Sequence, residues 1–150
     1  MHYQIREAAT SDIQQMHQVR LSVKENILMN KDLVKAEHYK SHILTTGKTW
    51  VAEVNNQIVG FAAVNIQEEN VWALFIHPEH EKKGLGKKLH TAMLDWYFKQ
   101  GKEYICLTTD PETRAAGFYK KLNWKESEKC PDGEIKMELT LKTYKGVKYK

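Results

Sequence analysis

Two glycines and four lysines gather within residues 82–88, which have the sequence KKGLGKK. Gly84 and Gly86 allow the backbone to approach a ligand closely, because glycine carries no side chain. The segment opens directly into a predicted helix, whose first N–H groups have no partner within the helix. The helix dipole and the lysines both favour an anion at this place. The residue types and their spacing therefore predict a site for a pyrophosphate group.

This loop differs from two well-known phosphate-binding loops. The dinucleotide-binding fingerprint needs a third glycine where this chain has Leu89. A Walker A loop needs a Ser or Thr at the metal position, whereas two lysines follow Gly86 here and no hydroxyl side chain stands in that place. A pair of glycines is a weak signal by itself, since a solvated turn has the same composition. The context of the loop must decide its role.

Histidine pairs are the other residues that suggest chemistry. His38 and His42 are four residues apart on one face of a predicted helix, and His77 and His80 flank Pro78. Neither pair is accompanied by a third ligand at the spacing that a zinc site needs. We therefore expect no metal site.

Sequence periodicity predicts the elements that position the loop. We expect a strand over residues 3–8 and helices over about 13–25 and 33–44. Two strands, 49–54 and 57–66, are joined by an Asn-Asn pair, which predicts a hairpin because asparagine tolerates the positive φ of a tight turn. Residues 71–76 are all apolar, as expected for a strand buried on both faces.

The second half of the sequence continues the alternation of helices and strands. Leu85, Leu89, Met93 and Trp96 form one helical stripe, which ends before Gly101. A short strand follows at 104–108, and Asp110 with Pro111 predicts the start of a helix that runs to about Leu122. Residues 124–127 and 134–141 predict a final β-pair. The order βααβββαβαββ indicates an α+β (α/β) fold, a sheet sandwiched by helices.

The net charge of +4 is concentrated in two places. Residues 136–150 contain five lysines and one glutamate, while the other 135 residues contain 18 basic and 18 acidic side chains. Within those 135, residues 81–88 contain four lysines and one glutamate. A nucleic-acid partner usually meets a broad basic face, so this distribution makes a nucleic-acid partner unlikely to be the main one.

Length and composition place further bounds on the protein. A chain of 150 residues with 41% hydrophobic residues predicts one domain over residues 1–150, with a flexible basic tail over about the last eight. No run approaches the 18 apolar residues of a membrane span. Cys106 and Cys130 form neither a disulfide framework nor a CxxC site, which predicts a reduced, cytoplasmic protein.

Two motifs together resemble those of the GCN5-related N-acetyltransferase (GNAT) superfamily. LFIHP at 74–78, followed by EKKGLG at 81–86, is similar to the family's strand and acyl-CoA loop, with the pattern (Gln/Arg)-x-x-Gly-x-(Gly/Ala). TRAAGFYKKLNW at 113–124 resembles the family pattern A-x-x-(F/L)-Y-x-K-x-G-(F/W). IREA at 5–8 with Asp12 resembles its first strand and helix. This resemblance covers nearly the whole chain. It implies a mixed, mostly antiparallel sheet of six to seven strands flanked by about four helices.

The resemblance also implies a function and a set of site residues. The activity would be transfer of an acetyl group from acetyl-CoA to a primary amine by direct attack. Ile76 would donate its N–H to the thioester carbonyl, and Tyr119 would protonate the departing CoA thiolate. The implied cofactor contacts are Leu74, Phe75, Ile76, Lys82, Lys83, Gly84, Leu85, Gly86, Lys87, Glu112, Ala115, Phe118, Tyr119 and Lys121. Lys87, Lys88 and Lys121 are the candidates for the 3′-phosphate.

Three positions depart from the family pattern. Glu81 stands where Gln or Arg is usual, and Glu112 replaces a common Asn, so both substitutions weaken an expected cofactor contact. Asn123 replaces the glycine after the last helix, although Asn is the next best residue for a left-handed conformation. The two glutamates leave a second interpretation open, namely a non-catalytic module on the same fold that binds acyl-CoA or a protein.

The general base and the acceptor are not assigned by the sequence. Glu25, and Glu68 or Glu69, belong to regions that flank the family's acceptor cleft, but an ordinary surface position explains each of them better. Trp72 alternates with Leu74 and Ile76 and lines either the acceptor pocket or the core. Lysine-rich proteins, polyamines, aminoglycosides and amino acids all remain possible acceptors, and the protein is expected to be a monomer or a homodimer.

Overall fold

The computed structural model describes residues 2–23 and 35–148. The chain divides into two units, residues 1–97 and residues 98–150, and each is described by itself. Seven strands and five α-helices lie within the described residues. Every strand pairing inside either unit is antiparallel. These features confirm the predicted α+β fold class, whereas the expectation of a single domain stays a prediction.

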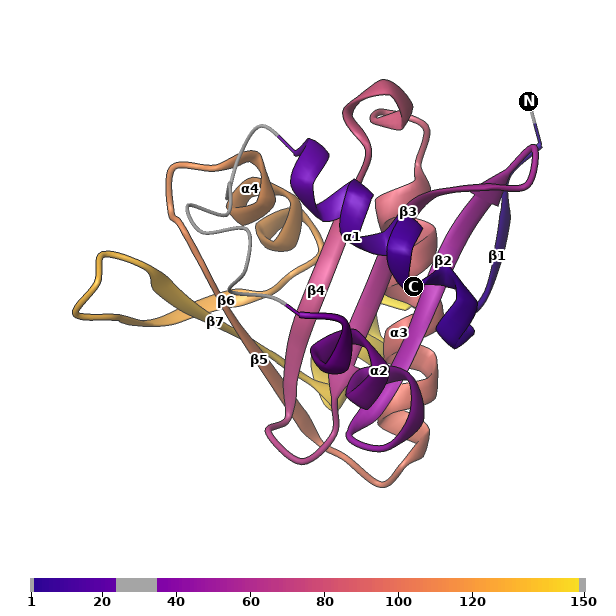
Figure 1. The fold of residues 1–150 in the computed structure, drawn as a ribbon. Helices are drawn as coiled ribbons and strands as arrows, with labels where there is room; N and C mark the ends of the chain where they lie inside the picture. Colours follow the sequence, from indigo (N-terminus) through magenta and orange to yellow (C-terminus); the bar gives the residue numbers. More distant parts are fainter. Residues whose placement is uncertain (1, 24–34, 149–150) are drawn as a thin grey trace. The chain divides into compact units, whose positions relative to one another are not determined.

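The first unit is built on a sheet of four strands in the order β1-β2-β3-β4 (Figure 1). Their bounds are Gln4–Glu7, Gly47–Val54, Gln57–Asn65 and Asn70–Ile76. Asn55 and Asn56 connect β2 to β3 with φ angles of 51° and 63°. Both residues therefore adopt the positive φ that a two-residue hairpin turn requires, and the predicted hairpin is confirmed.

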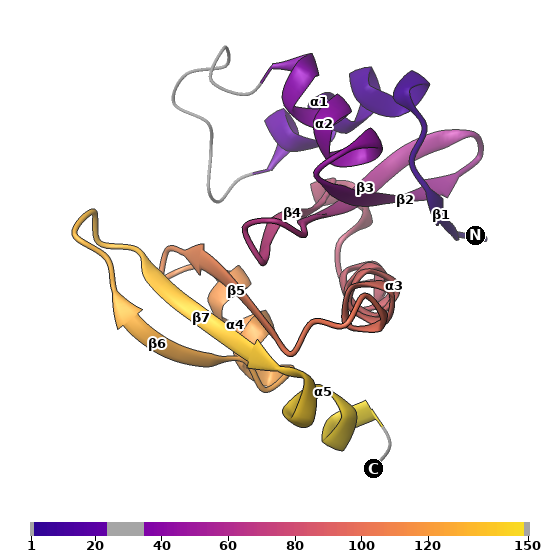
Figure 2. The same cartoon turned by 90° about the horizontal axis from the view of Figure 1, so that it is seen from below.

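Helices cover both faces of this sheet (Figure 2). Helices α1 (Ile13–Ser22) and α2 (Ala36–Leu44) lie on one face, and α3 (Leu85–Lys99) lies on the other. The core between the sheet and the first two helices consists of Met16, Val19, Tyr39, Val51, Ile58, Phe61, Ala63 and Ala73. The predicted continuations of α1 to residue 25 and of α2 back to residue 33 lie outside the described residues.

A bulge in β4 changes which way Trp72 points. Ala63 pairs with Ala73 and Val64 pairs with Val71, so Trp72 is an extra residue in β4. Its ring stacks on His42 of α2, with ring centroids 4.1 Å apart. The expected alternation of Trp72 with Leu74 and Ile76 is therefore wrong, because the extra residue shifts the period by one.

The second unit contains strands β5 (Tyr104–Thr109), β6 (Lys125–Lys129) and β7 (Ile135–Thr140), with β7 between the other two. The buried hydrophobic residues of β5 and β7 alternate along each strand and are Ile105, Leu107, Ile135, Met137 and Leu139. Helix α4 (Arg114–Lys121) connects β5 to β6. Strand β6 is exposed along its whole length, in agreement with its sequence of Lys, Glu and Ser.

Two helices of this unit differ from the expectation. The helix predicted to begin at Asp110 begins at Arg114, because the Asp110 carboxylate accepts a bond from the Glu112 N–H (2.9 Å) and Thr113 acts as the N-cap. The predicted flexible tail overlaps α5 (Leu141–Lys148). The ring of Tyr144 packs against that of Phe98 with centroids 5.3 Å apart, which favours an ordered helix here.

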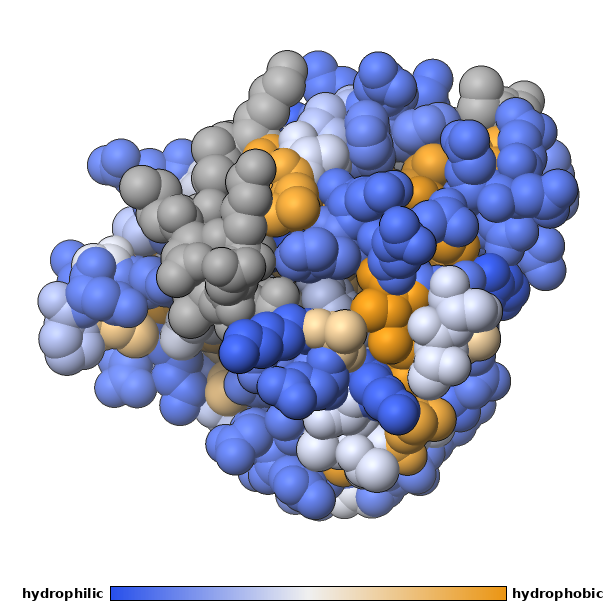
Figure 3. Space-filling view, viewed as in Figure 1, coloured by the Kyte–Doolittle hydropathy of each residue, from blue (hydrophilic) through white to orange (hydrophobic). Residues whose placement is uncertain are grey.

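The surface is largely hydrophilic in the view of Figure 3, with apolar residues in small separate areas. Leu21 and Leu44 are the large hydrophobic residues that the described part of the chain exposes. None of the described helices is both long enough and apolar enough to cross a membrane.

Candidate functional site

The predicted phosphate loop connects the end of β4 to the start of α3. Lys82 and Gly84 both have left-handed backbones, with φ angles of 62° and 78°. A Cβ atom at Gly84 would meet nothing within 4 Å, so the backbone angle and not space favours glycine there. These two reversals bring the chain to Leu85, where the helix begins. The loop thus delivers the free N–H groups of the first helical turn to the surface.

The first turns of α3 pack against the core on one side and carry exposed lysine side chains on the other. Leu85 and Leu89 are fully buried and hold the first two turns of the helix against the core. The lysine side chains of the loop and helix are exposed, namely Lys82, Lys83, Lys87 and Lys88. A fixed helix N-terminus surrounded by exposed lysines is suited to a phosphate group.

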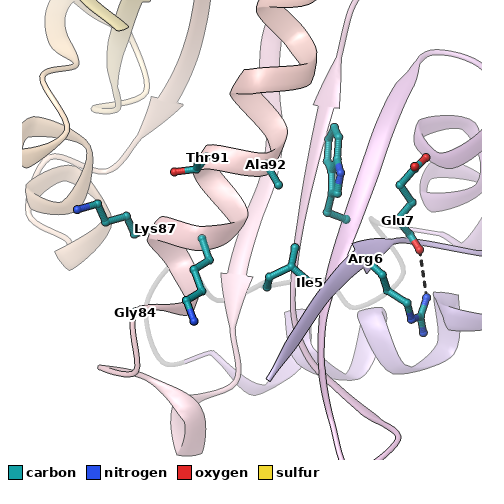
Figure 4. A pocket seen from close by; sticks show the side chains of 9 residues that line it. Ile5, Arg6, Glu7, Gly84, Lys87, Thr91 and Ala92 are labelled. Carbon is teal, nitrogen blue, oxygen red and sulfur yellow. Dashed lines mark hydrogen bonds between the residues drawn. The ribbon is translucent and has the colours of Figure 1, made fainter. Parts of the chain in front are cut away.

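An open groove of about 790 Å³ lies beside this helix. Figure 4 shows that strand β1 forms one wall and the first turns of α3 form the other. The lining residues are Ile5, Arg6, Glu7, Trp50, Gly84, Lys87, Lys88, Thr91 and Ala92. The groove thus extends from the glycine of the predicted phosphate loop.

The charge of Arg6 in this groove is already paired. Its Nη1 and Nη2 atoms donate to the two Asp12 carboxylate oxygens at 2.8 and 3.0 Å, and its Nε donates to Glu53 at 2.7 Å. The Ala9 N–H also donates to Asp12, at 2.8 Å. The guanidinium is the main cause of a lowered pKa of Asp12, and the Asp12 hydrogen bond raises the pKa of Arg6. This network ties β1 and β2 to the start of α1.

The pairing of β3 with β4 fixes the direction of the Ile76 N–H. Gly60 lies opposite Ile76, and the His77 N–H donates to the Val59 carbonyl at 2.8 Å. This pattern makes Gly60 and Ile76 a non-hydrogen-bonded pair. The N–H of Ile76 therefore points to the edge of β4 that faces away from β3.

Tyr119 lies on α4 in the second unit. It is 5% exposed, and its ring contacts Phe118 and Trp124 with centroids 5.2 and 5.3 Å apart. Burial raises the pKa of its hydroxyl well above the ordinary value, so the phenol keeps its proton at neutral pH. A protonated phenol can act as a general acid toward a thiolate.

Residues 11–124 match the family model described as the acetyltransferase (GNAT) family, and this match covers more than half of the chain. The chain belongs to this family. The resemblance found in its two motifs is thereby confirmed. Acetyl-CoA is the acetyl donor that GNAT proteins use.

Solved GNAT structures share the fold. An acetyltransferase of the GNAT family from Staphylococcus aureus Mu50 has 20% identity and a TM-score of 0.78, over 93% of this chain and 99% of that chain. The Escherichia coli ribosomal-protein-S18-alanine N-acetyltransferase has 18% identity and a TM-score of 0.76, over 93% and 94%. The PaiA N-acetyltransferase from Thermoplasma acidophilum, solved in complex with coenzyme A, has 18% and 0.74, over 93% and 99%. No curated protein has a significantly matching sequence. At these identities, the likeness shows the fold.

The structure of this GNAT protein places the predicted cofactor contacts in two groups. Leu74, Phe75 and Ile76 lead directly into the loop of residues 82–87, so the first unit brings these together. The other contacts lie on or just before α4 in the second unit. Of these, Ala115 and Phe118 are half-buried, whereas Glu112 and Lys121 are exposed.

The candidates for the general base receive little support. Glu25 lies outside the described residues. Glu69 sits in the turn before β4, with a φ of 54°, and Glu68 is exposed beside it. Seven residues of strand place Glu69 about 20 Å from Ile76, which is too far for direct proton transfer at that end of β4.

Sequence analysis missed a polar and aromatic cluster beneath α1 and α2. Arg20 of α1 lies over the Phe75 ring, with 4.3 Å between Cζ and the ring centroid. Nδ1 of His17 is hydrogen-bonded to the Tyr39 hydroxyl at 2.8 Å. These residues have no motif spacing, so only their contacts in the fold distinguish them. Across the described ranges, no three His, Cys, Asp or Glu side chains gather as a metal site would require.

Proposed function

We propose that this GNAT protein transfers the acetyl group of acetyl-CoA to a primary amine by direct attack of the amine on the thioester. One observation carries the proposal. The strand edge that presents the Ile76 N–H continues into the left-handed turns at Lys82 and Gly84 and then into a helix N-terminus. An oxyanion donor and a phosphate-binding loop thus follow each other along the chain, as a CoA thioester requires.

The residues present fit the phosphates of CoA. The loop offers backbone N–H groups from Lys82 to Lys87 and four exposed lysine side chains. Lys87, Lys88 and Lys121 are all exposed and stay the candidates for the 3′-phosphate. Glu81 is half-buried, so the pyrophosphate contact is proposed to come from the backbone and not from this side chain. The complex of PaiA from T. acidophilum with coenzyme A supports the choice of cofactor.

Two groups of the chain would act in the transfer step. The Ile76 N–H would donate to the thioester oxygen as negative charge develops there. As the bond between the amine nitrogen and the carbonyl carbon forms, the carbon–sulfur bond breaks and the electron pair stays on sulfur. Tyr119 would give its proton to that sulfur. The amine loses one proton to a base, for which Glu25 or a chain of water molecules stays a prediction.

The proposal extends to the setting of the protein. A reduced, cytoplasmic setting is proposed, because the spacing of Cys106 and Cys130 suggests no disulfide framework. The acceptor is proposed to be a small-molecule or protein amine, and a monomer or homodimer stays the expected state. A nucleic-acid partner is not favoured, because the excess basic residues are concentrated in residues 81–88 and 136–150 and not spread over the sequence.

The test is a turnover screen of the purified protein with acetyl-CoA and a panel of primary amines, with release of free thiol as the signal. Amine-dependent release is expected, and the mass of the protein should stay unchanged after incubation with acetyl-CoA alone. Tight CoA binding without release for any amine would instead support the non-catalytic module that Glu81 and Glu112 suggest.

A further inference from the structure

We infer that the acceptor amine carries a carboxylate, as a free amino acid does, and that this carboxylate binds the guanidinium of Arg20 beside β4. This inference rests on the proposed acetyl transfer and names the class of its acceptor. Arg20 lies in the last turn of α1, with its Cζ 4.3 Å from the centroid of the Phe75 ring.

The guanidinium of Arg20 is partly buried and has no carboxylate partner in the described part of the chain. Its Nη1 atom is buried and has no hydrogen-bond partner there. Burial lowers the pKa of Arg20, and among the described residues the Tyr39 hydroxyl acts in the opposite direction and raises it. A buried charge without a partner is costly, so an anionic ligand would gain a strong charge-assisted interaction at this position.

Arg6 provides a comparison, because it is an arginine of the same chain with a structural role. All three nitrogen types of Arg6 donate, to Asp12, Glu53 and the Glu7 carbonyl. Both arginines are partly buried, yet only Arg6 has carboxylate partners among the residues that the structure describes. The difference indicates that the guanidinium of Arg20 binds a ligand and does not serve mainly to stabilise the fold.

Arg20 lies on the face of the sheet that α1 and α2 cover, which is the proposed side of the acceptor. Figure 2 shows α1 and α2 on the opposite side of β3 and β4 from α3. Phe75 packs against the core between the sheet and the first two helices. The side chain of Ile76 lies on the other face of the sheet, close to Gly60 and Leu89. Phe75 directly precedes Ile76, whose N–H is proposed to bind the thioester oxygen.

The neighbouring side chains limit the size and charge of the acceptor. Phe61 lies 5.8 Å from Phe75 and 6.0 Å from Tyr39, and Tyr39 lies 5.4 Å from Trp72, all between ring centroids. Phe61 and Tyr39 are fully buried, so the half-buried rings of Phe75 and Trp72 are the ones that a small acceptor could contact. Because Phe75 directly precedes Ile76, the acceptor is proposed to have its amine and its carboxylate only a few bonds apart. Polyamines and aminoglycosides are polycations, which Arg20 would repel.

The experiment compares matched acceptors that differ only in the carboxylate. Phenylalanine is set against phenethylamine and phenylalaninamide, and leucine against isopentylamine, with thiol release from acetyl-CoA as the signal. We expect the amino acids to have kcat/KM values about 100-fold higher than those of the amines. Dipeptides with the same N-terminal residues test whether the carboxylate must lie on the amine-bearing carbon.

Arg20→Gln should lower kcat/KM for the amino acids by about 100-fold and leave the amines within about threefold. Lys40→Gln, which removes an exposed charge from neighbouring α2, should change neither. Unchanged CoA affinity and unfolding midpoint would show that Arg20→Gln folds normally. Equal turnover of amino acids and amines, or an equal loss for both in Arg20→Gln, would overturn the inference while acetyl transfer stands.

A second readout separates failure of the inference from failure of the proposed function. Phenylalanine is titrated by calorimetry into the CoA-saturated protein and into Arg20→Gln. If no amine is acetylated, binding that depends on Arg20 would still support a carboxylate site, and absence of such binding would overturn it. Absence of CoA binding would contradict the proposed function separately.

Discussion

The burial of Tyr119 sets its chemistry. Because burial raises the pKa of the phenol, the hydroxyl is protonated throughout the range in which the enzyme would work. A protonated phenol can give a proton to the thiolate but cannot take one from the amine. This restricts the proposed role to the leaving thiolate, and it leaves the base to another group or to water.

Tyr119→Phe should lower kcat by about 100-fold or more while the CoA dissociation constant changes little, because only the proton donor is lost. Steady-state turnover and equilibrium CoA titration measure the two quantities. Tyr104→Phe is the matched control, since its hydroxyl donates to Glu138 within the second unit at 3.0 Å. An unchanged kcat in Tyr119→Phe would remove this residue from the mechanism.

His90 should make the fold sensitive to acid. It is 3% exposed, and burial lowers its pKa from 6.5 to about 4. Between these values the unfolded chain binds the proton and the folded chain does not, so stability falls as the pH is lowered through this window. We expect a loss of about 2 kcal/mol between pH 7 and pH 4.5 from this residue.

Denaturant unfolding of the wild type and His90→Gln at the two pH values checks this. The variant should lose less stability on acidification, whereas His2→Gln, at an exposed position, should behave as the wild type. An identical pH dependence in His90→Gln would contradict the assignment of the effect to this histidine.

At the scale of elements, the turn that starts α3 can be compared with the turn that ends it. Gly84 and Gly101 have φ angles of 78° and 84°, and a Cβ atom at either would meet nothing within 4 Å. Alanine at either position should therefore cost about 1 kcal/mol of stability through backbone strain alone. Only Gly84→Ala should also weaken CoA binding, by about tenfold.

Thermal unfolding and CoA titration of the two variants form a matched pair. Equal losses of stability with a selective loss of CoA affinity in Gly84→Ala support the loop as the phosphate site. Equal CoA affinity in both variants would place the phosphates elsewhere.

The network of Arg6, Asp12 and Glu53 should hold β1 and β2 to α1. Asp12→Asn removes the charge that two Arg6 nitrogens contact and should destabilise the fold by about 2 kcal/mol. Because the folded pKa of Asp12 is lowered, this contribution is present above pH 4 or so and is lost as the pH falls further. Urea unfolding at pH 7 and pH 3 measures it, and a difference that does not shrink at pH 3 would argue against the charge as its origin.

For the whole molecule, local signals predicted most of the fold. The Asn55-Asn56 pair and the stripe of α3 each act within a few residues, and each was confirmed. The apolar run at 71–76 correctly predicted strand β4, but the expected burial on both faces is wrong, because its residues other than Ala73 are only half-buried. The bulge at Trp72 could not be predicted, because it depends on the pairing of β4 with β3. Helix α5 likewise depends on the contact of Tyr144 with Phe98, more than 40 residues earlier.

The candidate site divides in the same way. The phosphate loop is contiguous in sequence, so its glycines and lysines were visible as a motif. Arg20 was not identified as a candidate site residue, because a single arginine in a helix forms no sequence pattern. Its contact with the Phe75 ring is visible only in the folded structure. A sequence pattern can therefore identify site residues that lie together in one loop. It cannot identify residues that only the fold brings together.

The central claim is that this GNAT protein joins an acetyl group to an amine. The most direct measurement is a parallel count, by mass spectrometry and thiol titration, of N-acetylated amine formed and CoA released. We predict one acetylated amine for each thiol, with little thiol released when the amine is omitted. CoA release without an acetylated amine, or a protein that binds CoA and produces neither, would contradict the account.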